Sequence, residues 1–230
     1  MAPPASLHGV TFAFRRHLAA APLLSTYNEI SGSKPEPTSL RKTGGASESF
    51  AEQLSQAVRD RKTIVISGGT GSGKTTLLNS LLAEISGEER LITIEDAPEL
   101  RPPHANIVRL ISSRGGLGEA GVTSRDLLEA SLRLRPSRIL LGELRGAEAF
   151  TFLRAINTGH PGSVTTVHAD TPERALIQIA LMTQQAGLGL NYEDAHRLAV
   201  ETIDLLVQMD YRGGRRAVRV HAPSAVGKDP

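Results

Sequence analysis

Cysteine is absent from this sequence of 230 residues, and its absence excludes disulfide bonds, thiolate catalysis and zinc sites built from cysteine. Tryptophan is absent as well, and aromatic residues make up only 3% of the chain, which argues against a surface that binds single-stranded nucleic acid by base stacking. No apolar run reaches the length of about 18 residues that marks a membrane-spanning helix. Residues 1–4 lack the basic and apolar segments of a secretory signal, so we expect a cytoplasmic protein.

The charge of the chain is nearly balanced. It has 26 basic residues against 24 acidic ones, a net charge of +2 with neutral histidines, so its overall field does not favour a nucleic-acid partner. One basic run, at residues 212–219, is explained by solvated arginines on the edge of a hairpin. We therefore do not expect direct binding of nucleic acid.

Composition divides the chain into three parts. In residues 1–30, the alternation of apolar and other side chains at 10–14 predicts one short strand, which must pair with another element to be stable. Residues 31–46 are rich in Ser, Gly, Pro and Lys, as is typical of a linker. We expect a folded domain over residues 47–230, which opens with a helix capped by Ser47.

Strand and helix patterns alternate from residue 63 onward. Runs of β-branched and apolar residues predict the strands, and apolar residues at helical spacing between caps predict the helices. The alternation is typical of a mostly parallel sheet with helices on both faces, so the predicted fold class is α/β. The predicted strands are 63–67, 90–94, 107–111, 139–141 and 164–167, with a final hairpin of 203–209 and 216–220, and the predicted helices are 75–85, 123–134, 146–157, one that begins at Thr171 and Pro172, and 192–201.

Residues 68–75, Gly-Gly-Thr-Gly-Ser-Gly-Lys-Thr, fit the phosphate-binding pattern G-x-x-x-x-G-K-[ST] between a predicted strand and a predicted helix. In such a loop, glycines let backbone amides surround the phosphates, and the helix N-terminus adds partial positive charge. We expect Lys74 to reach the outer phosphates and the Thr75 hydroxyl to ligate Mg²⁺. The sequence therefore predicts a nucleoside triphosphate and Mg²⁺ as ligands. The expected nucleotide-binding residues are Gly69, Thr70, Gly71, Ser72, Gly73, Lys74, Thr75 and Thr76.

Acidic residues follow two of the predicted strands. Glu95 comes directly after the run 91–94, and Glu143 follows Gly142 after the run 139–141. Ligands of open α/β sheets bind at the carboxyl ends of the strands, where a carboxylate can hold Mg²⁺ through water or activate the attacking water. We assign Glu143 to activation of water and Glu95 to the metal side, and the pattern leaves the reverse assignment open.

Two histidines flank the predicted strand at 164–167. His160 precedes this strand and His168 follows it. A histidine at a strand end can sense the γ-phosphate or hydrogen-bond a catalytic acid, so both are candidate site residues. A zinc site is a poor interpretation, because no third ligand stands at a suitable spacing.

These segments together resemble the secretion ATPase superfamily. The residues that carry the resemblance are 68–76, 94–100, 134–145 and 159–169, which correspond in order to the Walker A, Asp box, Walker B and His box of that superfamily. Within it, the chain is most similar to the VirB-type traffic ATPases of type IV secretion and conjugation. The resemblance implies a RecA-like domain, ATP and Mg²⁺ as ligands, and a homo-hexameric ring. It also implies inner-membrane secretion proteins as partners and a place at the cytoplasmic face of the bacterial inner membrane.

The resemblance further implies an N-terminal domain whose arginines reach the nucleotide phosphates. Residues 10–14 look like the last strand of such a domain, so residues 1–30 are expected to be its remnant, and Arg15 is a candidate catalytic residue with Arg16 as its competitor. An arginine on the transferred phosphate can raise the rate by roughly 10³ to 10⁵. The resemblance implies that most of that domain is missing from this sequence, so we expect nucleotide binding ahead of ring assembly and full turnover.

Other functions are compatible with the same motifs. A type II secretion or pilus-extension ATPase usually carries a four-cysteine metal module, whose absence weighs against these types, while the pilus-retraction type remains open. A nucleotide-dependent assembly module with little turnover is the alternative from a different class. The leading prediction is an ATP-hydrolysing motor subunit of a type IV secretion or conjugation apparatus.

Overall fold

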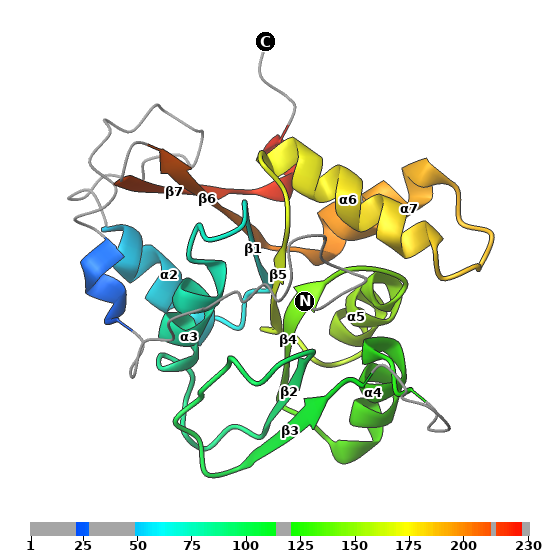
Figure 1. The fold of residues 1–230 in the computed structure, drawn as a ribbon, viewed down its shortest axis with the longest axis horizontal. Helices are drawn as coiled ribbons and strands as arrows, with labels where there is room; N and C mark the ends of the chain where they lie inside the picture. The colour runs from blue at the N-terminus through cyan, green and yellow to red at the C-terminus, as the bar shows by residue number, and fades with distance from the viewer. Residues whose placement is uncertain (1–21, 28–48, 114–120, 213–214, 227–230) are drawn as a thin grey trace, which may run out of the picture.

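The computed structural model describes residues 22–27, 49–113, 121–212 and 215–226, and its centre is a seven-stranded sheet (Figure 1). The strand order is β3-β2-β4-β5-β1-β6-β7. All neighbouring strands are parallel except the last pair, in which β7 runs antiparallel to β6. The strands are β1 (Ile64–Gly68), β2 (Leu91–Glu95), β3 (Ile107–Ile111), β4 (Arg138–Leu144), β5 (Val164–Val167), β6 (Leu205–Arg212) and β7 (Arg215–His221).

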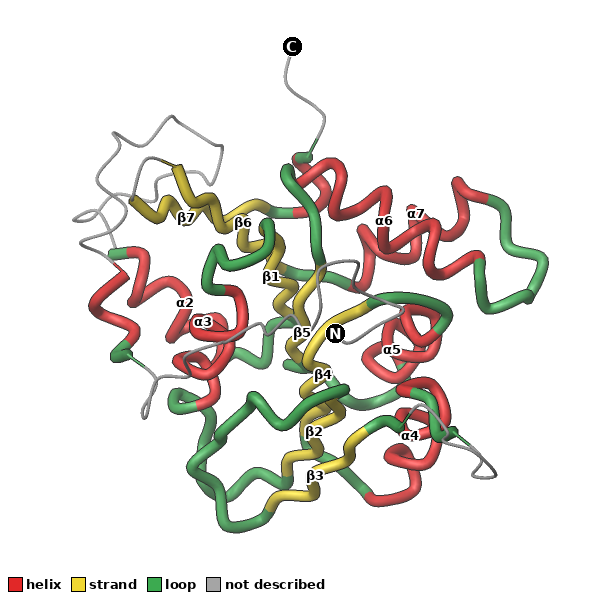
Figure 2. The backbone as a smooth tube through the Cα atoms, in the orientation of Figure 1, coloured by secondary structure: helices red, strands yellow, loops and turns green. Residues whose placement is uncertain are grey.

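Helices cover both faces of this sheet, as the tube in Figure 2 also shows. On one face lie α2 and α3, and on the other lie α4, α5, α6 and α7. This arrangement confirms the prediction of an α/β fold with a mostly parallel sheet. The helices are α2 (Phe50–Arg59), α3 (Lys74–Leu82), α4 (Ser124–Ser131), α5 (Glu148–Asn157), α6 (Pro172–Gln184) and α7 (Tyr192–Thr202), with the short 3₁₀ helices η1 (Leu24–Thr26), η2 (Leu132–Leu134) and η3 (Pro223–Ala225).

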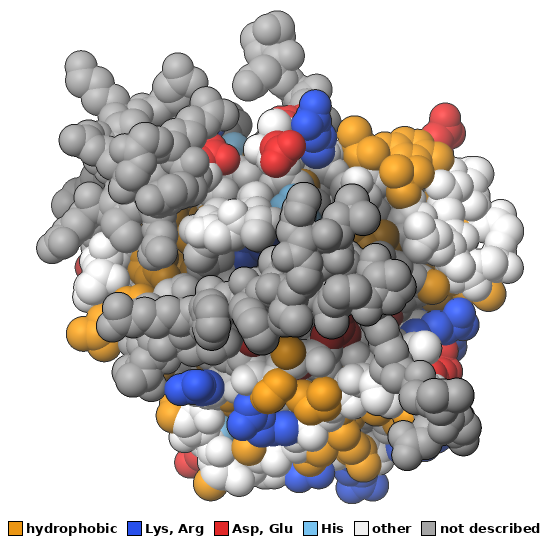
Figure 3. All heavy atoms as spheres, in the orientation of Figure 1, with side chains coloured by type: hydrophobic (Ala, Val, Ile, Leu, Met, Phe, Trp, Pro, Cys, Tyr) orange, Lys and Arg blue, Asp and Glu red, His pale blue; other side chains and the backbone are white. Residues whose placement is uncertain are grey.

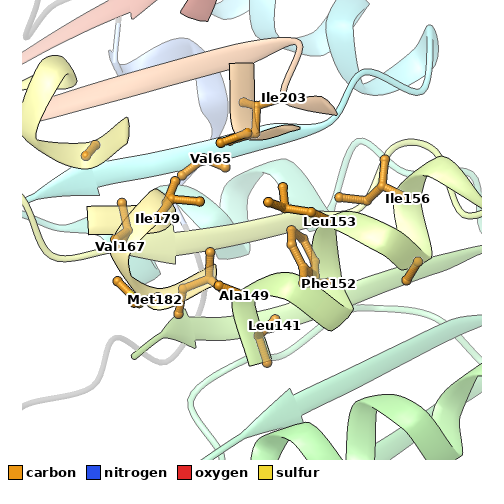
Figure 4. Close-up of a cluster of buried hydrophobic side chains, with 14 of the residues drawn as sticks. Val65, Leu141, Ala149, Phe152, Leu153, Ile156, Val167, Ile179, Met182 and Ile203 are labelled. Carbon is orange, nitrogen blue, oxygen red and sulfur yellow. The ribbon is translucent and has the colours of Figure 1, made fainter. Parts of the chain in front are cut away.

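The alternation of side chains along β1 explains why the core has two parts. Ile64 and Ile66 pack with α2 and α3, whereas Val65 points to the opposite face and packs with α5 and α6. Figure 4 shows this second cluster, in which Phe152 and Leu153 of α5 lie beside Ile179 of α6. A central parallel strand must be apolar on both faces, because helices cover both sides of it.

The first helix begins two residues later than predicted. Ser49, not Ser47, is the N-cap of α2, so the prediction for Ser47 is wrong. The Ser49 hydroxyl accepts a hydrogen bond from the Glu52 amide at 3.2 Å, and the Glu52 carboxylate accepts one from the Ser49 amide at 2.8 Å. This reciprocal pair needs a Glu or Gln three residues after the cap, and only Ser49 has one.

Other boundaries follow from local hydrogen bonds. Thr171 caps α6 and Pro172 opens it, as predicted. The helix expected at 146–157 starts at Glu148 instead. The Glu148 carboxylate accepts hydrogen bonds from the amides of Arg145 at 2.6 Å and Gly146 at 2.8 Å, which holds these two residues in a turn before the helix. The final hairpin is present, with longer strands than predicted.

The strand predicted at 10–14, the linker at 31–46 and the candidate Arg15 lie outside the described residues. Within the expected remnant, residues 22–27 are described and pack on the ATPase-like domain. Leu24 and Tyr27 are buried against α2 and α3, and the Ser80 hydroxyl of α3 donates to the Pro22 carbonyl at 2.8 Å. The boundary between the predicted parts stays a prediction.

Among the described segments, no helix has both the length and the apolar character needed to cross a membrane.

Candidate active site

The predicted motifs meet at one edge of the sheet. Because β1, β2, β4 and β5 are parallel, their carboxyl ends lie side by side. The phosphate-binding loop leaves β1, Glu95 ends β2, Glu143 lies near the end of β4, and His168 follows β5. β5 lies between β1 and β4, so one strand separates the loop from Glu143.

The loop at residues 68–75 depends on glycine at its root and at its end. A Cβ on Gly68 would lie 2.5 Å from the Met209 carbonyl oxygen of the neighbouring strand β6, which leaves no room for a side chain. Gly73 has φ of 99°, in the left-handed region that glycine adopts without strain, and it is the N-cap of α3. The loop therefore turns from β1 into the N-terminus of α3.

Two polar side chains of this loop fit a bound phosphate. Lys74 Nζ donates to the carbonyl oxygens of Gly68 at 2.8 Å and Gly69 at 2.9 Å, so the ammonium group is folded over the loop. The Ser72 hydroxyl is buried and has no hydrogen-bond partner among the described residues. A buried polar group without a partner is costly, and a phosphate oxygen at this loop would supply one. Thr75 stands in the first turn of α3 and is partly exposed, as a Mg²⁺ ligand must be.

Glu95 is the most buried acid of the site, with 4% of its surface exposed. Its Oε1 accepts hydrogen bonds from the amides of Glu99 at 2.8 Å and Leu100 at 2.7 Å. Its Oε2 has no hydrogen-bond partner among the described residues, and the Arg109 guanidinium is 4.0 Å away. Burial raises the pKa of Glu95 above its ordinary value, although the two amides and Arg109 oppose the rise. One oxygen of Glu95 is thus fixed by two amides, and the other is buried without a hydrogen bond from the described residues.

Glu143 lies in a β-bulge that the sequence did not predict. Leu141 pairs with Thr165 and Leu144 pairs with Val167, so β4 has one more residue than β5 between these pairs. The predicted strand 139–141 is therefore too short, since β4 continues to Leu144. Leu141 and Leu144 both pack in the same apolar cluster, which regular alternation would not allow. The bulge interrupts the regular alternation of side chains at Glu143. Bulges often lie next to active sites, where they redirect a side chain.

The parallel pairing of β2 with β4 brings the two acidic motifs into contact. A Cβ on Gly142 would lie 3.4 Å from Glu95 Cγ, so Gly142 borders the Glu95 side chain directly. The Thr166 hydroxyl of β5 donates to the Gly142 carbonyl at 2.8 Å and holds the bulge from its other side. Glu95 and Glu143 therefore belong to one constellation.

Arg145 connects Glu143 with Asp96, the neighbour of Glu95, a link that the sequence did not predict. Its guanidinium donates to Glu143 Oε2, with Nε at 2.7 Å and Nη2 at 2.6 Å, and it forms a second ion pair with Asp96. Partial burial lowers the pKa of Arg145, but Glu143 and Asp96 outweigh that effect and raise it above the ordinary value. Asp96 also accepts a hydrogen bond from the Ser112 hydroxyl at 2.6 Å. The available signal for this pair was its position in the sequence, with Asp96 next to Glu95 and Arg145 two residues after Glu143.

The two candidate histidines lie at opposite ends of β5. His168 is exposed at the carboxyl end of β5, which pairs directly with β1, the strand that leads into the phosphate-binding loop. His160 precedes β5 at the other edge, where its Nδ1 lies 3.0 Å from the Pro136 carbonyl oxygen before β4. The structure brings His168 to the acids and the loop, and it does not bring His160 there. A catalytic role for His160 stays a prediction without support from this placement.

Comparison with known proteins identifies the family. A family model described as "Type II/IV secretion system protein" matches residues 32–208. The chain belongs to this family. Among the family's curated members, the type IV secretion system protein VirB11 of Bartonella quintana is 48% identical over 168 residues, which is 72% of this chain and 47% of that protein. The type IV secretion system protein PtlH of Bordetella pertussis is 42% identical over 193 residues, which is 82% of this chain and 56% of that protein.

A solved structure of the family is similar as well. The VirB11 ATPase of the Brucella suis type IV secretion system, crystallised in complex with sulphate, has a TM-score of 0.67 and 40% sequence identity, covering 75% of this chain and 52% of that chain. These relatives confirm the predicted RecA-like P-loop fold and the VirB-type branch of the family. The chain spans about half the length of the relatives it matches.

Proposed function

We propose that this chain binds and hydrolyses ATP as part of a motor subunit of a type IV secretion or conjugation apparatus. The observation that carries the proposal is the meeting of the phosphate-binding loop, Glu95, Glu143 and His168 at one sheet edge in a member of the type II/IV secretion family. Fold alone does not set function, but this set of residues has the parts that phosphoryl transfer to water requires.

The loop is proposed to hold the phosphates. The amides of residues 69–76 and the N-terminus of α3 face the anion, and Lys74 exchanges its contacts with the carbonyls of Gly68 and Gly69 for phosphate oxygens. The Thr75 hydroxyl and a carboxylate, through water, would hold Mg²⁺, which supplies charge neutralisation when bound. The Ser72 hydroxyl, which has no hydrogen-bond partner in the part of the chain that the structure describes, supports this site, because a phosphate oxygen at the loop would satisfy it.

Glu143 is proposed as the residue that activates water. Both hydrogen bonds from Arg145 go to Oε2, so the guanidinium orients the carboxylate and leaves Oε1 for the proton of the attacking water. Glu95 is proposed to act on the metal side through Oε2, which accepts no hydrogen bond from the described residues. His168, which follows the strand next to β1, is proposed to respond to the γ-phosphate, and Arg15 is proposed from the family resemblance alone.

The assembly is proposed from the resemblance and from the names of the relatives. We propose a homo-hexamer at the cytoplasmic face of the inner membrane that works with inner-membrane secretion proteins. Figure 3 shows hydrophobic side chains gathered over the region of α6 and α7, and such exposed apolar surface is typical of protein contacts. The exposed large side chains there are Ile177, Leu181, Leu188 and Tyr192, between 39% and 56% exposed.

The deciding experiment measures ATP turnover and nucleotide binding of the purified chain with and without Mg²⁺. We expect Mg²⁺-dependent turnover that disappears in Lys74→Ala, because the lysine supplies the charge that holds the outer phosphates. Lys62→Ala is the matched control, since Lys62 pairs with Asp204 before β1 and lies away from the loop. Turnover that is equal in the wild type and in Lys74→Ala would contradict the proposal.

A further inference from the structure

A glutamine outside all of the sequence motifs is buried beside the end of β1, where the phosphate-binding loop begins. Gln208 lies on β6 directly opposite Ser67 of β1, and only 2% of it is exposed. Its Oε1 accepts a hydrogen bond from the Ser67 hydroxyl. Its Nε2 donates to the carbonyl oxygens of Asp170 at 3.2 Å and Ala169 at 3.4 Å. A buried carboxamide is costly unless it is hydrogen-bonded, and here both of its ends are bonded.

The partners of Gln208 belong to two separate parts of the site. Ser67 is the residue before Gly68, where the phosphate-binding loop begins, and Ala169 is the residue after His168. β6 and β5 are not neighbours, because β1 lies between them. The Gln208 side chain therefore reaches across the end of β1 and joins the loop's root to the segment that carries His168.

We infer that Gln208 is a positioning residue for the proposed ATPase reaction, because its buried carboxamide fixes the backbone beside His168 relative to the strand that carries the phosphate-binding loop. The inference rests on the proposed function, and Gln208 lies outside the sequence motifs that predict that function. Glutamine suits the task because it offers one acceptor and two donors on a side chain long enough to cross a strand. His168 itself is exposed, so its own side chain does little to fix its position.

The kinetic test compares Gln208→Leu with the wild-type chain. Leucine fills a similar volume without hydrogen bonds, so we expect kcat to fall by about 10-fold or more, since a misplacement of about 1 Å can cost about 10²-fold in rate. ADP affinity should change by less than about 2-fold, because the loop amides remain. Thr183→Val is the matched control, since Thr183 is equally buried and its hydroxyl bonds only to Ile179 of its own helix.

A double-mutant cycle with His168→Ala separates positioning from general loss of structure. If Gln208 acts through His168, Gln208→Leu lowers kcat in the wild-type background and changes it little in the His168→Ala background. An equal fractional loss in both backgrounds overturns the inference. If Gln208→Leu does not fold, Ser67→Ala replaces it, because this variant removes the hydroxyl that donates to Gln208 Oε1. Its kcat is then compared in the wild-type and His168→Ala backgrounds, and an equal fractional loss in both overturns the inference.

A second readout does not depend on turnover. The ring signal of His168 in an NMR spectrum should shift in Gln208→Leu, while that of His196, on α7, stays in place. Thr183→Val should move neither signal. An unchanged His168 signal overturns the inference. A wild-type chain that binds no nucleotide and shows no turnover contradicts the proposed function instead, and the His168 signal then decides the role of Gln208 alone.

Discussion

Arg145 binds Glu143 through two nitrogens that share one carboxylate oxygen, with Nε at 2.7 Å and Nη2 at 2.6 Å from Oε2. The two residues are separated by Leu144 alone, the last residue of β4, so Arg145 follows the strand directly. The same guanidinium contacts Asp96, the neighbour of Glu95. A single side chain therefore links the two acidic motifs.

The first prediction concerns this link. Replacing Arg145 with Lys keeps the charge but loses the fixed fork of donors, so we expect kcat to fall by about 10-fold while ADP affinity stays within about 2-fold. Steady-state kinetics and titration with a fluorescent nucleotide measure the two quantities. Arg125→Lys is the control, because Arg125 makes an exposed pair with Glu129 on α4. An unchanged kcat in Arg145→Lys would show that the ion pair does not orient Glu143.

The second prediction concerns Glu143. Glutamine has nearly the same shape but cannot accept a proton from water, so Glu143→Gln should lower kcat by about 10² to 10⁴-fold. Nucleotide binding should persist, because the loop and Lys74 are untouched. Glu129→Gln on the exposed face of α4 should leave both values unchanged. A variant that turns over normally would move the role of the base from Glu143 to Glu95.

The third prediction is a pH dependence that Glu95 imposes on stability. Burial raises the pKa of Glu95, so the folded chain holds this proton at a pH where the unfolded chain releases it. The stability tied to the proton is fully present below the ordinary pKa of 4.5 and is lost as pH rises through the raised value. Glu95→Gln should therefore have a higher Tm than the wild type near neutral pH.

That difference in Tm should shrink as the pH falls below 4.5, because the wild-type carboxyl is then protonated as well. Differential scanning fluorimetry across this range measures it. Glu88→Gln, at an exposed position between α3 and β2, should show no such trend. A constant difference at every pH would mean that the effect of Glu95→Gln is not linked to this proton.

The fourth prediction concerns a buried ion pair far from the proposed chemistry. Arg138 at the start of β4 is 2% exposed and binds both carboxylate oxygens of Glu89, at 2.8 Å and 2.7 Å. Arg138→Met leaves Glu89 with only the more exposed Arg61, so the free energy of unfolding should fall by about 3 kcal/mol. Denaturant titration measures this loss.

Arg197→Met provides the comparison, since Arg197 pairs with Asp194 at the surface of α7 and should cost less than about 1 kcal/mol. Arg138 also lowers the pKa of Glu89, so the stability that depends on this pair is lost as pH falls through the lowered pKa. The gap between wild type and Arg138→Met should therefore narrow in acid. Equal losses in the two variants would contradict a special role for the buried pair.

The sequence predicted most of the architecture because its signals are local. Apolar runs bounded by glycine gave the order of strands and helices, and the loop at 68–75 was readable from spacing alone. The cap was wrongly predicted at Ser47, although Glu52, three residues after Ser49, was the local signal for the correct cap.

Several features of the site escaped prediction because they depend on pairing between distant strands. The bulge at Glu143 exists only relative to β5, and the placement of His160 depends on which end of β5 faces the loop. Gln208 is separated by 141 residues from Ser67, its partner on β1. A single sequence carries no local sign of such contacts.

The position of β5 between β1 and β4 acts as a spacer in the proposed reaction. Neighbouring strands lie about 4.8 Å apart, so the strand that leads to the phosphates and the strand that carries Glu143 are separated by about 10 Å at the backbone. In the proposed reaction, this gap is where the terminal phosphoryl group, the attacking water and the Glu143 carboxylate would lie.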